Sequence, residues 1–470
     1  MYIQQLYTGC LSEAAYYIES EGEAAIIDPL RDIEVYLQLA KERNAIIKYI
    51  FETHFHADFI SGHLDLATAT NAPIVYGPNT ETNFPVHVAK DGEIFTIGKL
   101  TIQTLHTPGH TLESTCYLLK DESGKNHAIF TGDTLFVGDV GRPDLSQKTN
   151  GLTMNDLAGM LYESLQNKIV PLADDVIVYP AHGPGSSCGK NLGPDTFSTI
   201  GNEKQTNYAL LAQNKNDFIK AVTEGLAAPP QYFPVNAKIN KEGYESMDKI
   251  LSDALKPLPV KRFKELMNYE NIILLDTRPA DIFVNGFIPG SIGIGLEGRF
   301  AEWSGNLLPF DKQLILITEN GKEKESVVRL ARVGFENFKG YLDGSFEAWK
   351  KAGEEIDMII DVEADEVAMD LQFDKNMVII DVRKEVEFAD GHIKDAVNIP
   401  LQNFTDPASM ANINDTDNLY IQCGGGYRSV IASSLLKKQG IHNLRNIYGG
   451  WNAIKENKKI EKEKSTAVLN

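Results

Sequence analysis

The chain has 470 residues, too many for a single hydrophobic core, and this length predicts about three domains. Its hydrophobic content of 43% is that of a globular protein, and its formal charge of −20 argues against nucleic acid or an anionic membrane as a partner. No apolar run approaches the roughly 20 residues of a membrane span and the first residues lack a signal-peptide pattern, so we expect a cytoplasmic protein.

Residues 1 to about 230 alternate short strands with helical stretches, as an α/β domain does. A β-branched run at 46–50 is followed by His54, His56 and Asp58. Imidazoles two residues apart can reach one ion from such a loop and a carboxylate adds an oxygen donor, so this loop predicts a metal site. Later turns and strand ends carry further polar groups, namely His110, Asp133, Arg142 and His182.

The order and flanks of these segments resemble the metallo-β-lactamase superfamily, a four-layer αβ/βα sandwich with metal at one edge of its two sheets. The superfamily pattern His-x-His-x-Asp-His occurs here with Phe59 in place of the last histidine. Because a phenyl ring cannot bind a metal, this departure argues against two-metal hydrolases such as glyoxalase II and favours a single ion.

Within the superfamily, Thr-His-x-His-Ala-Asp with the later Thr-Pro-Gly-His-Thr, Thr-Gly-Asp and Gly-Arg-x-Asp is most similar to the persulfide dioxygenases. That resemblance implies one Fe(II) per chain held by His54, His110 and Asp133, with three coordination positions open for a persulfide sulfur and O2. The resemblance also places three further residues behind these ligands or facing the substrate, namely His56, Asp58 and His182. From its loop position, Arg142 is expected to bind a carboxylate or phosphate of the thiol carrier.

The remaining histidines of this half are expected outside the site, with His63 on a helix surface or at a helix cap. The four cysteines are scattered and predict no disulfide framework. Cys116 is expected in the core and Cys10 in an early turn, whereas Cys188 lies on a loop soon after His182 where substrate could pass.

Prolines flank a polar stretch after residue 229, and beyond it the chain repeats itself, with Asp276-Thr277-Arg278 aligned on Asp381-Val382-Arg383 at an offset of 105 residues. Each repeat alternates apolar strands with helices, which favours a parallel sheet. The predicted organisation is a first domain over 1–235, a linker over 236–258, two α/β domains over 259–355 and 360–458, and a flexible tail over 459–470.

In the second repeat Cys423 ends a strand and is followed by Gly424, Gly425, Gly426, Tyr427 and Arg428, with a helix expected from Val430. Amide groups in such a loop and the helix N-terminus stabilise a thiolate, which would make Cys423 a nucleophile. Arg428 is expected to hold an anionic sulfur substrate, and the glycines and Tyr427 to contact it. The segment resembles a rhodanese domain, and the Cys-x4-Arg spacing is that of a sulfurtransferase. The first repeat has no cysteine and is similar to a degenerate rhodanese, with an expected structural or interdomain role.

The resemblance therefore implies a persulfide dioxygenase–rhodanese fusion. Such an enzyme oxidises a thiol persulfide with O2 to sulfite, and Cys423 passes a sulfane sulfur to sulfite to give thiosulfate. The reverse flow of sulfur is equally compatible with the sequence, and the family implies a homo-oligomer, a dimer or tetramer. Two alternatives stay open: a zinc thioester hydrolase of the glyoxalase II type, and a sulfur-responsive binding protein without turnover.

Overall fold

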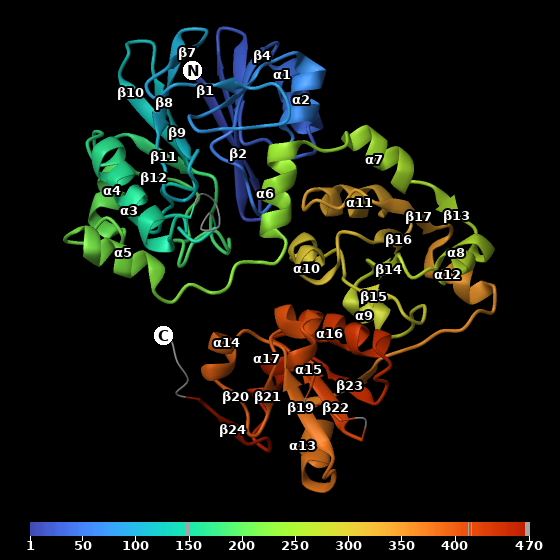
Figure 1. Ribbon diagram of the computed structural model, residues 1–470. Coiled ribbons are helices and arrows are strands. Elements are labelled where there is room, and N and C mark those ends of the chain that lie inside the picture. The colour runs from blue at the N-terminus through green and yellow to red at the C-terminus, as the bar shows by residue number, and fades with distance from the viewer. Residues whose placement is uncertain (146–150, 412, 415, 466–470) are drawn as a thin grey trace. The chain divides into compact units, whose positions relative to one another are not determined.

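The computed structural model describes residues 1–145, 151–411, 413–414 and 416–465 (Figure 1). The chain forms two compact units, one of residues 1–247 with 331–335 and one of residues 248–330 with 336–469. Among the helices that the structure describes, none is long and apolar enough to cross a membrane.

The first unit contains two six-stranded sheets, with strand orders β1-β2-β3-β4-β5-β6 and β12-β11-β10-β9-β8-β7. The strands of the first sheet are β1 (Tyr2–Thr8), β2 (Glu13–Ser20), β3 (Glu23–Ile27), β4 (Ile46–Phe51), β5 (Ile74–Tyr76) and β6 (His87–Val88). Those of the second are β7 (Ile94–Ile97), β8 (Leu100–His106), β9 (Thr115–Lys120), β10 (Asn126–Gly132), β11 (Ile177–Pro180) and β12 (Ser198–Thr199).

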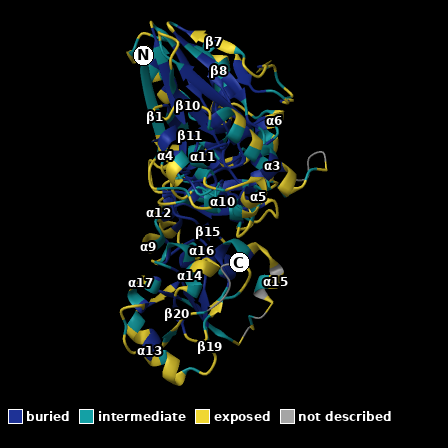
Figure 2. Cartoon of the chain, turned by 90° about the vertical axis from the view of Figure 1, so that its left-hand side faces the viewer, coloured by how far each residue is buried: buried dark blue, intermediate teal, exposed yellow. Residues whose placement is uncertain are grey.

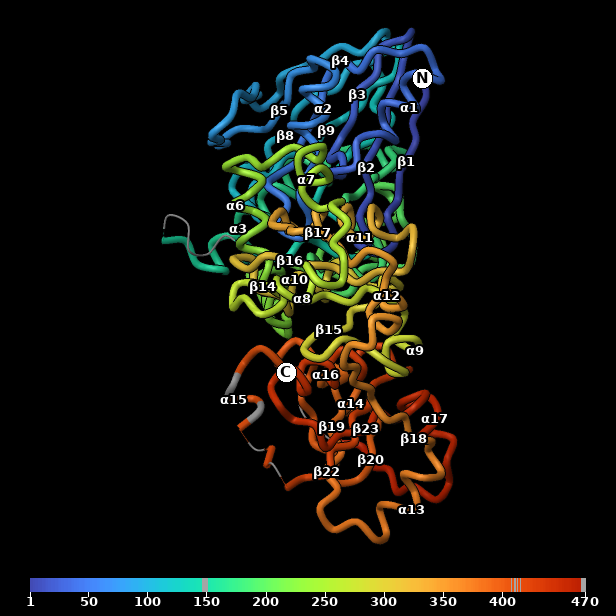
Figure 3. Tube along the Cα trace, turned by 90° about the vertical axis from the view of Figure 1, so that its right-hand side faces the viewer, coloured from blue at the N-terminus to red at the C-terminus, as the bar shows by residue number. Residues whose placement is uncertain are grey.

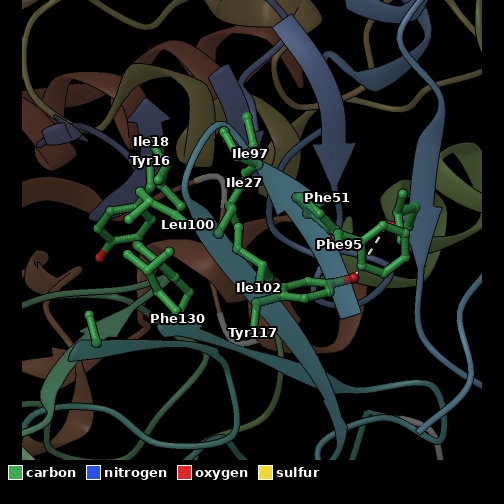
Figure 4. Close-up of a cluster of buried hydrophobic side chains, with 14 of the residues drawn as sticks. Tyr16, Ile18, Ile27, Phe51, Phe95, Ile97, Leu100, Ile102, Tyr117 and Phe130 are labelled. Carbon is green, nitrogen blue, oxygen red and sulfur yellow. Dashed lines mark hydrogen bonds between the residues drawn. The ribbon is translucent and has the colours of Figure 1, made fainter. Parts of the chain in front are cut away.

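The inner faces of these sheets meet in an aromatic core (Figure 4). Phe51 from the first sheet lies edge-on to Phe95 from the second, with ring centroids 5.2 Å apart, and Tyr16 packs in the same way on Phe130 at 4.9 Å. Successive side chains along a strand point to opposite faces, and both faces are apolar here. In β9, Tyr117 and Leu119 lie in this core, whereas Cys116 and Leu118 face the helices.

Helices cover the outer faces of both sheets. The first sheet packs on α1 (Glu34–Glu42) and α2 (His63–Thr70), and the second on α3 (Met154–Ser164), a π-helical turn (Leu165–Ile169), α4 (Ile200–Thr206) and α5 (Lys215–Thr223). In Figure 2, strands β8, β10 and β11 are mostly buried beneath these layers. The expected αβ/βα sandwich is confirmed. Loops that follow β4, β8, β10 and β11 carry the polar residues of the predicted metal site.

The second unit contains two five-stranded sheets with equivalent strand orders, β13-β17-β16-β14-β15 and β18-β23-β22-β19-β21, and every pair within them is parallel. The first comprises β13 (Pro257–Leu258), β14 (Ile272–Asp276), β15 (Ile292–Gly293), β16 (Gln313–Ile317) and β17 (Phe338–Leu342). The second comprises β18 (Ile360–Val362), β19 (Met377–Asp381), β21 (Val397–Asn398), β22 (Asn418–Gln422) and β23 (Leu444–Ile447), and Figure 3 shows β19, β22 and β23 together. The prediction of two parallel-sheet α/β domains is confirmed.

Helices surround both sheets. Those of the first repeat are α8 (Val260–Leu266), α9 (Ala280–Phe283), α10 (Phe300–Leu307), α11 (Glu323–Ala331) and α12 (Ser345–Lys351). Those of the second are α13 (Ala364–Phe373), α14 (Glu385–Ala389), a 3-10 turn (Leu401–Thr405), α15 (Pro407–Met410), α16 (Tyr427–Lys438) and α17 (Gly450–Ile454).

An arginine anchors the same turn in both repeats. Arg278 pairs with Asp276 and donates to the Gly286 carbonyl at 3.0 Å, and Arg383 pairs with Asp381 and donates to the Gly391 carbonyl at 2.7 Å. Each guanidinium also lies over an aromatic ring, Phe346 in the first repeat and Trp451 in the second. The sequence repeat is thus a repeat of buried contacts.

The expected linker and the expected tail both contain regular structure. The linker over 236–258 is largely helical, with α6 (Phe233–Glu242) and α7 (Met247–Ala254). The tail is not free from residue 459, because Ile460 is only 3% exposed and β24 (Lys462–Glu463) pairs with β20 (His392–Ile393). One buried isoleucine and a short strand suffice to tie down a Lys/Glu-rich segment.

Candidate metal centre and cysteine loop

Three side chains from three loops converge at one edge of the sandwich. His54 follows β4, His110 follows β8 and Asp133 follows β10. Asp133 Oδ2 lies 3.8 Å from His54 Nε2 and 3.3 Å from His110 Nε2, and all three residues are at most 2% exposed. Within the described part of the chain Asp133 Oδ2 has no hydrogen-bond partner. Two imidazole nitrogens and one carboxylate oxygen so arranged fit a metal cation.

Hydrogen bonds fix both histidines with Nε2 available for a metal. His110 Nδ1 donates to the Arg142 carbonyl at 2.9 Å. His54 Nδ1 lies 3.0 Å from Thr53 Oγ1, whose own proton goes to Asp28 Oδ2 at 2.8 Å, so the imidazole is the donor. Each Nε2 then carries a lone pair, as a ligand nitrogen must, and its ring orientation is set from behind.

Asp133 is held as a carboxylate by a buried histidine. His182 Nδ1 lies 2.7 Å from Asp133 Oδ1, and His182 Nε2 lies 2.7 Å from Asp58 Oδ2. Burial alone would lower the pKa of His182, but these two carboxylates raise it well above its ordinary value. Burial would raise the pKa of Asp133, yet His182 and His54 hold it well below its usual range. His182 and Asp58 thus lie beside the three converging atoms and orient one of them.

His56 is directed away from that cluster into an acidic pair. Its Nε2 lies 3.0 Å from Asp28 Oδ1 and 3.5 Å from Glu52 Oε2, and its ring packs on Phe59 with centroids 4.3 Å apart. Burial would lower the pKa of His56, but Asp28 and Glu52 raise it well above its ordinary value. Burial in turn raises the pKa of Glu52 to about 7, against the opposing effect of His56. His56 thus belongs to a separate cluster with Asp28 and Glu52 rather than to the group of His54, His110 and Asp133.

Asn240 on α6 supports the loop that carries these residues. Its side-chain nitrogen donates to the carbonyls of His56 and Phe59 at 2.8 and 2.7 Å, and its oxygen accepts from the Ser61 amide at 3.0 Å. Asn240 is fully buried. The sequence offered no signal for this role, because the residue lies about 180 positions away in a stretch interpreted as linker.

Arg142 is placed differently from its expectation. Its Nε and Nη2 donate to both carboxylate oxygens of Asp144 at 2.6 and 2.7 Å, and further donors reach the carbonyls of Ser187 and Ala227. The side chain is buried. These contacts argue against the expected binding of substrate, and the residue instead ties three loops together while its carbonyl orients His110.

Two other expectations change with burial. His63 is not on a helix surface, because it is fully buried and stacks on Phe84 with ring centroids 5.1 Å apart. Cys188 is buried rather than lining an open loop, and its Sγ lies within 4.8 Å of polar atoms of Asp58 and His182. Burial and the nearby carboxylates raise the pKa of the Cys188 thiol well above its ordinary value. Cys116 lies in the core, as expected.

The second unit carries the cysteine loop between β22 and α16. Cys423 is 1% exposed, the Gly426 amide donates to its Sγ at 3.1 Å, and Ser429 Oγ lies 3.4 Å away. Gly426 has φ +111°, a conformation that glycine adopts without strain. The helix begins at Tyr427, so its N-terminal amide groups lie next to the sulfur.

Arg428 lies over the same loop but already has an anionic partner. Its Nη1 and Nη2 pair with the two oxygens of Glu387 at 2.7 and 2.8 Å. A Cβ added at Gly424 would lie 3.2 Å from Arg428 Nη2, so the guanidinium packs directly on the glycine loop. An anion at the loop would therefore share Arg428 with Glu387.

A metal centre on an αβ/βα sandwich, followed by two parallel α/β domains of which one has a cysteine loop, defines a two-part enzyme class. Family models match in the same order: residues 8–182 match the metallo-beta-lactamase superfamily, and residues 259–352 and 364–457 each match the rhodanese-like domain. The chain belongs to the metallo-beta-lactamase superfamily through its first domain and carries two rhodanese-like domains.

Several known proteins are similar to this chain. A metallo-beta-lactamase structure from Staphylococcus aureus subsp. aureus COL is 33% identical with a TM-score of 0.65, over 73% of this chain and 98% of that one. A structure of ETHE1 from Myxococcus xanthus is 30% identical with a TM-score of 0.44, over 51% of this chain and 98% of that one. A probable hydroxyacylglutathione hydrolase of Schizosaccharomyces pombe is 31% identical over 183 residues, which are 38% of this chain and 66% of that protein. The match to this hydrolase thus spans just under two thirds of its length.

Proposed function

We propose that the first domain oxidises a low-molecular-weight thiol persulfide with O2 at a single Fe(II). One persulfide, one O2 and one water give one thiol, one sulfite and two protons. The observation that supports this best is the pairing of Phe59 with His56. Phe59 has no donor atom, and His56 pairs with Asp28 and Glu52, so the superfamily's second metal position lacks the histidine at position 59. Asp58 and His182 remain there beside Cys188, whereas His54, His110 and Asp133 converge as a two-histidine, one-carboxylate set. A two-histidine, one-carboxylate set is typical of non-haem Fe(II) oxygenases.

The bound iron would supply binding and activation of O2 beside the persulfide sulfur. The chain's own residues provide the rest. His54, His110 and Asp133 would hold the ion, and Thr53, Asp28 and the Arg142 carbonyl fix the two imidazoles. A proton stays on His182 between Asp58 and Asp133, which keeps Asp133 ionised. Burial of all these groups excludes water from the ligand set.

In the last domain, we propose that Cys423 transfers a sulfane sulfur. Its thiolate attacks the outer sulfur of a persulfide, a bond to Sγ forms, and the donor's S–S bond breaks to release a thiolate. Sulfite then takes the outer sulfur and leaves as thiosulfate, which regenerates Cys423. The Gly426 amide, 3.1 Å from Sγ, would stabilise the thiolate in both steps. Because sulfite is a product of the first domain, joining the two activities on one chain raises its effective concentration.

Metal and oxygen measurements test the first activity. Protein loaded anaerobically with iron should consume O2 only when persulfide is present, and His110→Ala should lose this uptake. The similarity to a probable hydroxyacylglutathione hydrolase favours one alternative function, that of a zinc thioester hydrolase. Two zincs per chain with thioester cleavage and no oxygen uptake would establish that rival. A binding protein without turnover would show no loss of activity in either His110→Ala or Cys423→Ser.

Product analysis tests the second activity. Wild-type protein supplied with persulfide and O2 should accumulate thiosulfate, and Cys423→Ser should accumulate sulfite instead. Thiosulfate consumption by the wild type would reveal the reverse flow of sulfur. We also propose a homo-oligomer, a dimer or tetramer, which light scattering in solution would test.

A further inference from the structure

We propose that a pocket beside the Cys423 loop binds the ammonium group of a small amino thiol persulfide, and so selects amino-bearing sulfur donors over neutral or phosphate-bearing ones. The proposal rests on sulfur transfer at Cys423 and adds the chemical class of the donor. It also gives the degenerate repeat a role, since that repeat contributes one wall of the pocket.

The pocket lies within the second unit and has a volume of about 350 Å³. One wall comes from the first repeat, around α9 and the segment after β15, and the other from the cysteine loop and the end of β23. Figure 1 shows α9 and β15 next to α16. Tyr427 Oη donates to the Gly295 carbonyl at 2.8 Å and Ser434 Oγ accepts from the Gly293 amide at 3.1 Å, so the two walls are joined by hydrogen bonds.

The lining is acidic. Asp281 and Glu297 come from the first repeat and Asp361 from the second, and none of the described residues that line the pocket is basic. Arg329 is the guanidinium next to this wall, but it donates to the carbonyls that flank Glu297 and lies 3.7 Å from Glu325. Phosphate groups would be repelled here, whereas a cation would be attracted.

Asn446 adds a hydrogen-bond acceptor to the lining. Asn446 is 2% exposed, and its Nδ2 is used on Asp361 Oδ1 at 2.7 Å. Its Oδ1 is buried and has no hydrogen-bond partner in the described structure. A buried acceptor left unpaired costs free energy, so the site favours a ligand that donates. Tyr427 and Tyr448 add aromatic rings, which attract ammonium groups. A primary ammonium has three donors and no acceptor, which matches this lining.

The pocket borders the cysteine loop, although Cys423 itself is not among the residues that line it. Gly425 and Gly426 line it, and the Gly426 amide is the group that donates to Cys423 Sγ. A ligand with its ammonium among the carboxylates can therefore direct its sulfur toward the cysteine loop. In the transfer, Sγ bonds to the donor's outer sulfur, the donor's S–S bond breaks, and the amino thiol leaves as its thiolate, which takes up a proton from solvent.

A matched pair of donors tests the proposal. The persulfides of cysteamine and 2-mercaptoethanol differ in one group, an ammonium against a hydroxyl. With iron-loaded full-length protein under anaerobic conditions, thiosulfate formation from each donor and sulfite reports the Cys423 step alone. We expect kcat/KM to be about tenfold higher for cysteamine persulfide than for 2-mercaptoethanol persulfide, because KM is lower. Coenzyme A persulfide should give a lower kcat/KM than cysteamine persulfide. In the double variant Asp281→Asn, Glu297→Gln the preference should vanish, whereas Asp311→Asn, an exposed carboxylate outside the pocket, should retain it.

A binding measurement separates this proposal from the transfer activity. Calorimetry with S-methylcysteamine and 2-(methylthio)ethanol needs no turnover, and only the amine should bind, with affinity lost in the double variant. Equal binding of both compounds, or binding unchanged in the double variant, would overturn the pocket assignment even if Cys423 transfers sulfur. Selective amine binding without any thiosulfate formation would instead overturn the transfer activity and leave the pocket's selectivity in place.

Discussion

His56 Nε2 lies 3.0 Å from Asp28 Oδ1, and this contact separates His56 from the group of His54, His110 and Asp133. Asp28 also accepts from Thr53, whose hydroxyl orients His54. One buried carboxylate therefore holds His56 away from the metal cluster and His54 in position at it.

The hydroxyl of Thr53 should matter for metal affinity. Thr53→Val removes the link between Asp28 and His54 at nearly constant volume, and metal affinity should fall about 10- to 100-fold, as for other groups that orient ligands. Thr53→Ser keeps the hydroxyl and serves as the control. Competitive titration with a metal chelator measures both. Wild-type affinity in the valine variant would show that Thr53 does not position His54.

Phe59 should limit the site to one metal. Phe59→His places an imidazole next to Asp58, so the bound metal measured by elemental analysis should rise from one per chain toward two. Phe59→Leu, which is also apolar, should stay at one. Two metals in both the wild type and the leucine variant would refute the single-ion interpretation.

Asn240 should be a stabilising residue of the metal loop. Asn240→Ala leaves the Ser61 amide and two carbonyls without their partner, and the free energy of unfolding should fall by about 2 kcal/mol. Lys238→Ala, an exposed change on the same helix, should have little effect. Denaturant unfolding measures both, and equal stability of the two variants would contradict the role given to Asn240.

His63 should make the protein less stable in acid. Burial and the nearby charges of His56 and Arg31 lower the pKa of His63 to about 3, whereas an unfolded histidine titrates near pH 6.5. At pH values between these two pKa values, His63 binds a proton in the unfolded chain but not in the folded one. The free energy of unfolding should therefore fall as pH falls, by up to about 1.4 kcal/mol per pH unit.

His63→Phe keeps a ring against Phe84 and should flatten this pH dependence between pH 6 and pH 4, roughly the window set by these pKa values. His442→Gln, whose side chain is 65% exposed in the wild type, should leave the dependence unchanged. The measurement is the free energy of unfolding of the wild type and the two variants across that pH range. An identical slope in the wild type and His63→Phe would show that His63 is not held neutral.

The sequence predicted what is local in the chain. The loop after β4, the strand-end groups and the cysteine loop are short segments whose residues and spacing define their chemistry, and the repeat of Asp276 and Asp381 marked two domains. Contacts between distant segments were not predictable. Asn240 reaches the metal loop from a helix in an expected linker, and Ile460 anchors an expected tail, because burial depends on tertiary packing that local composition does not encode.

The same limit explains the corrections at individual side chains. Arg142 stands in a loop typical of ligand binding, yet its donors are taken by Asp144 and by two carbonyls from residues far along the chain. His63 follows a helix-start pattern, and only the packing of Phe84 and Tyr244 around it shows that it is interior.

The central claim is that one ion at His54, His110 and Asp133 supports oxygen chemistry on a persulfide. The most direct measurement is the ratio of O2 consumed to sulfite plus thiosulfate formed, in Cys423→Ser and wild-type protein holding one iron per chain. We predict one O2 per sulfite in the cysteine variant, with no uptake in His110→Ala. Persulfide or thioester turnover without oxygen uptake, in protein that holds two zincs, would contradict the claim.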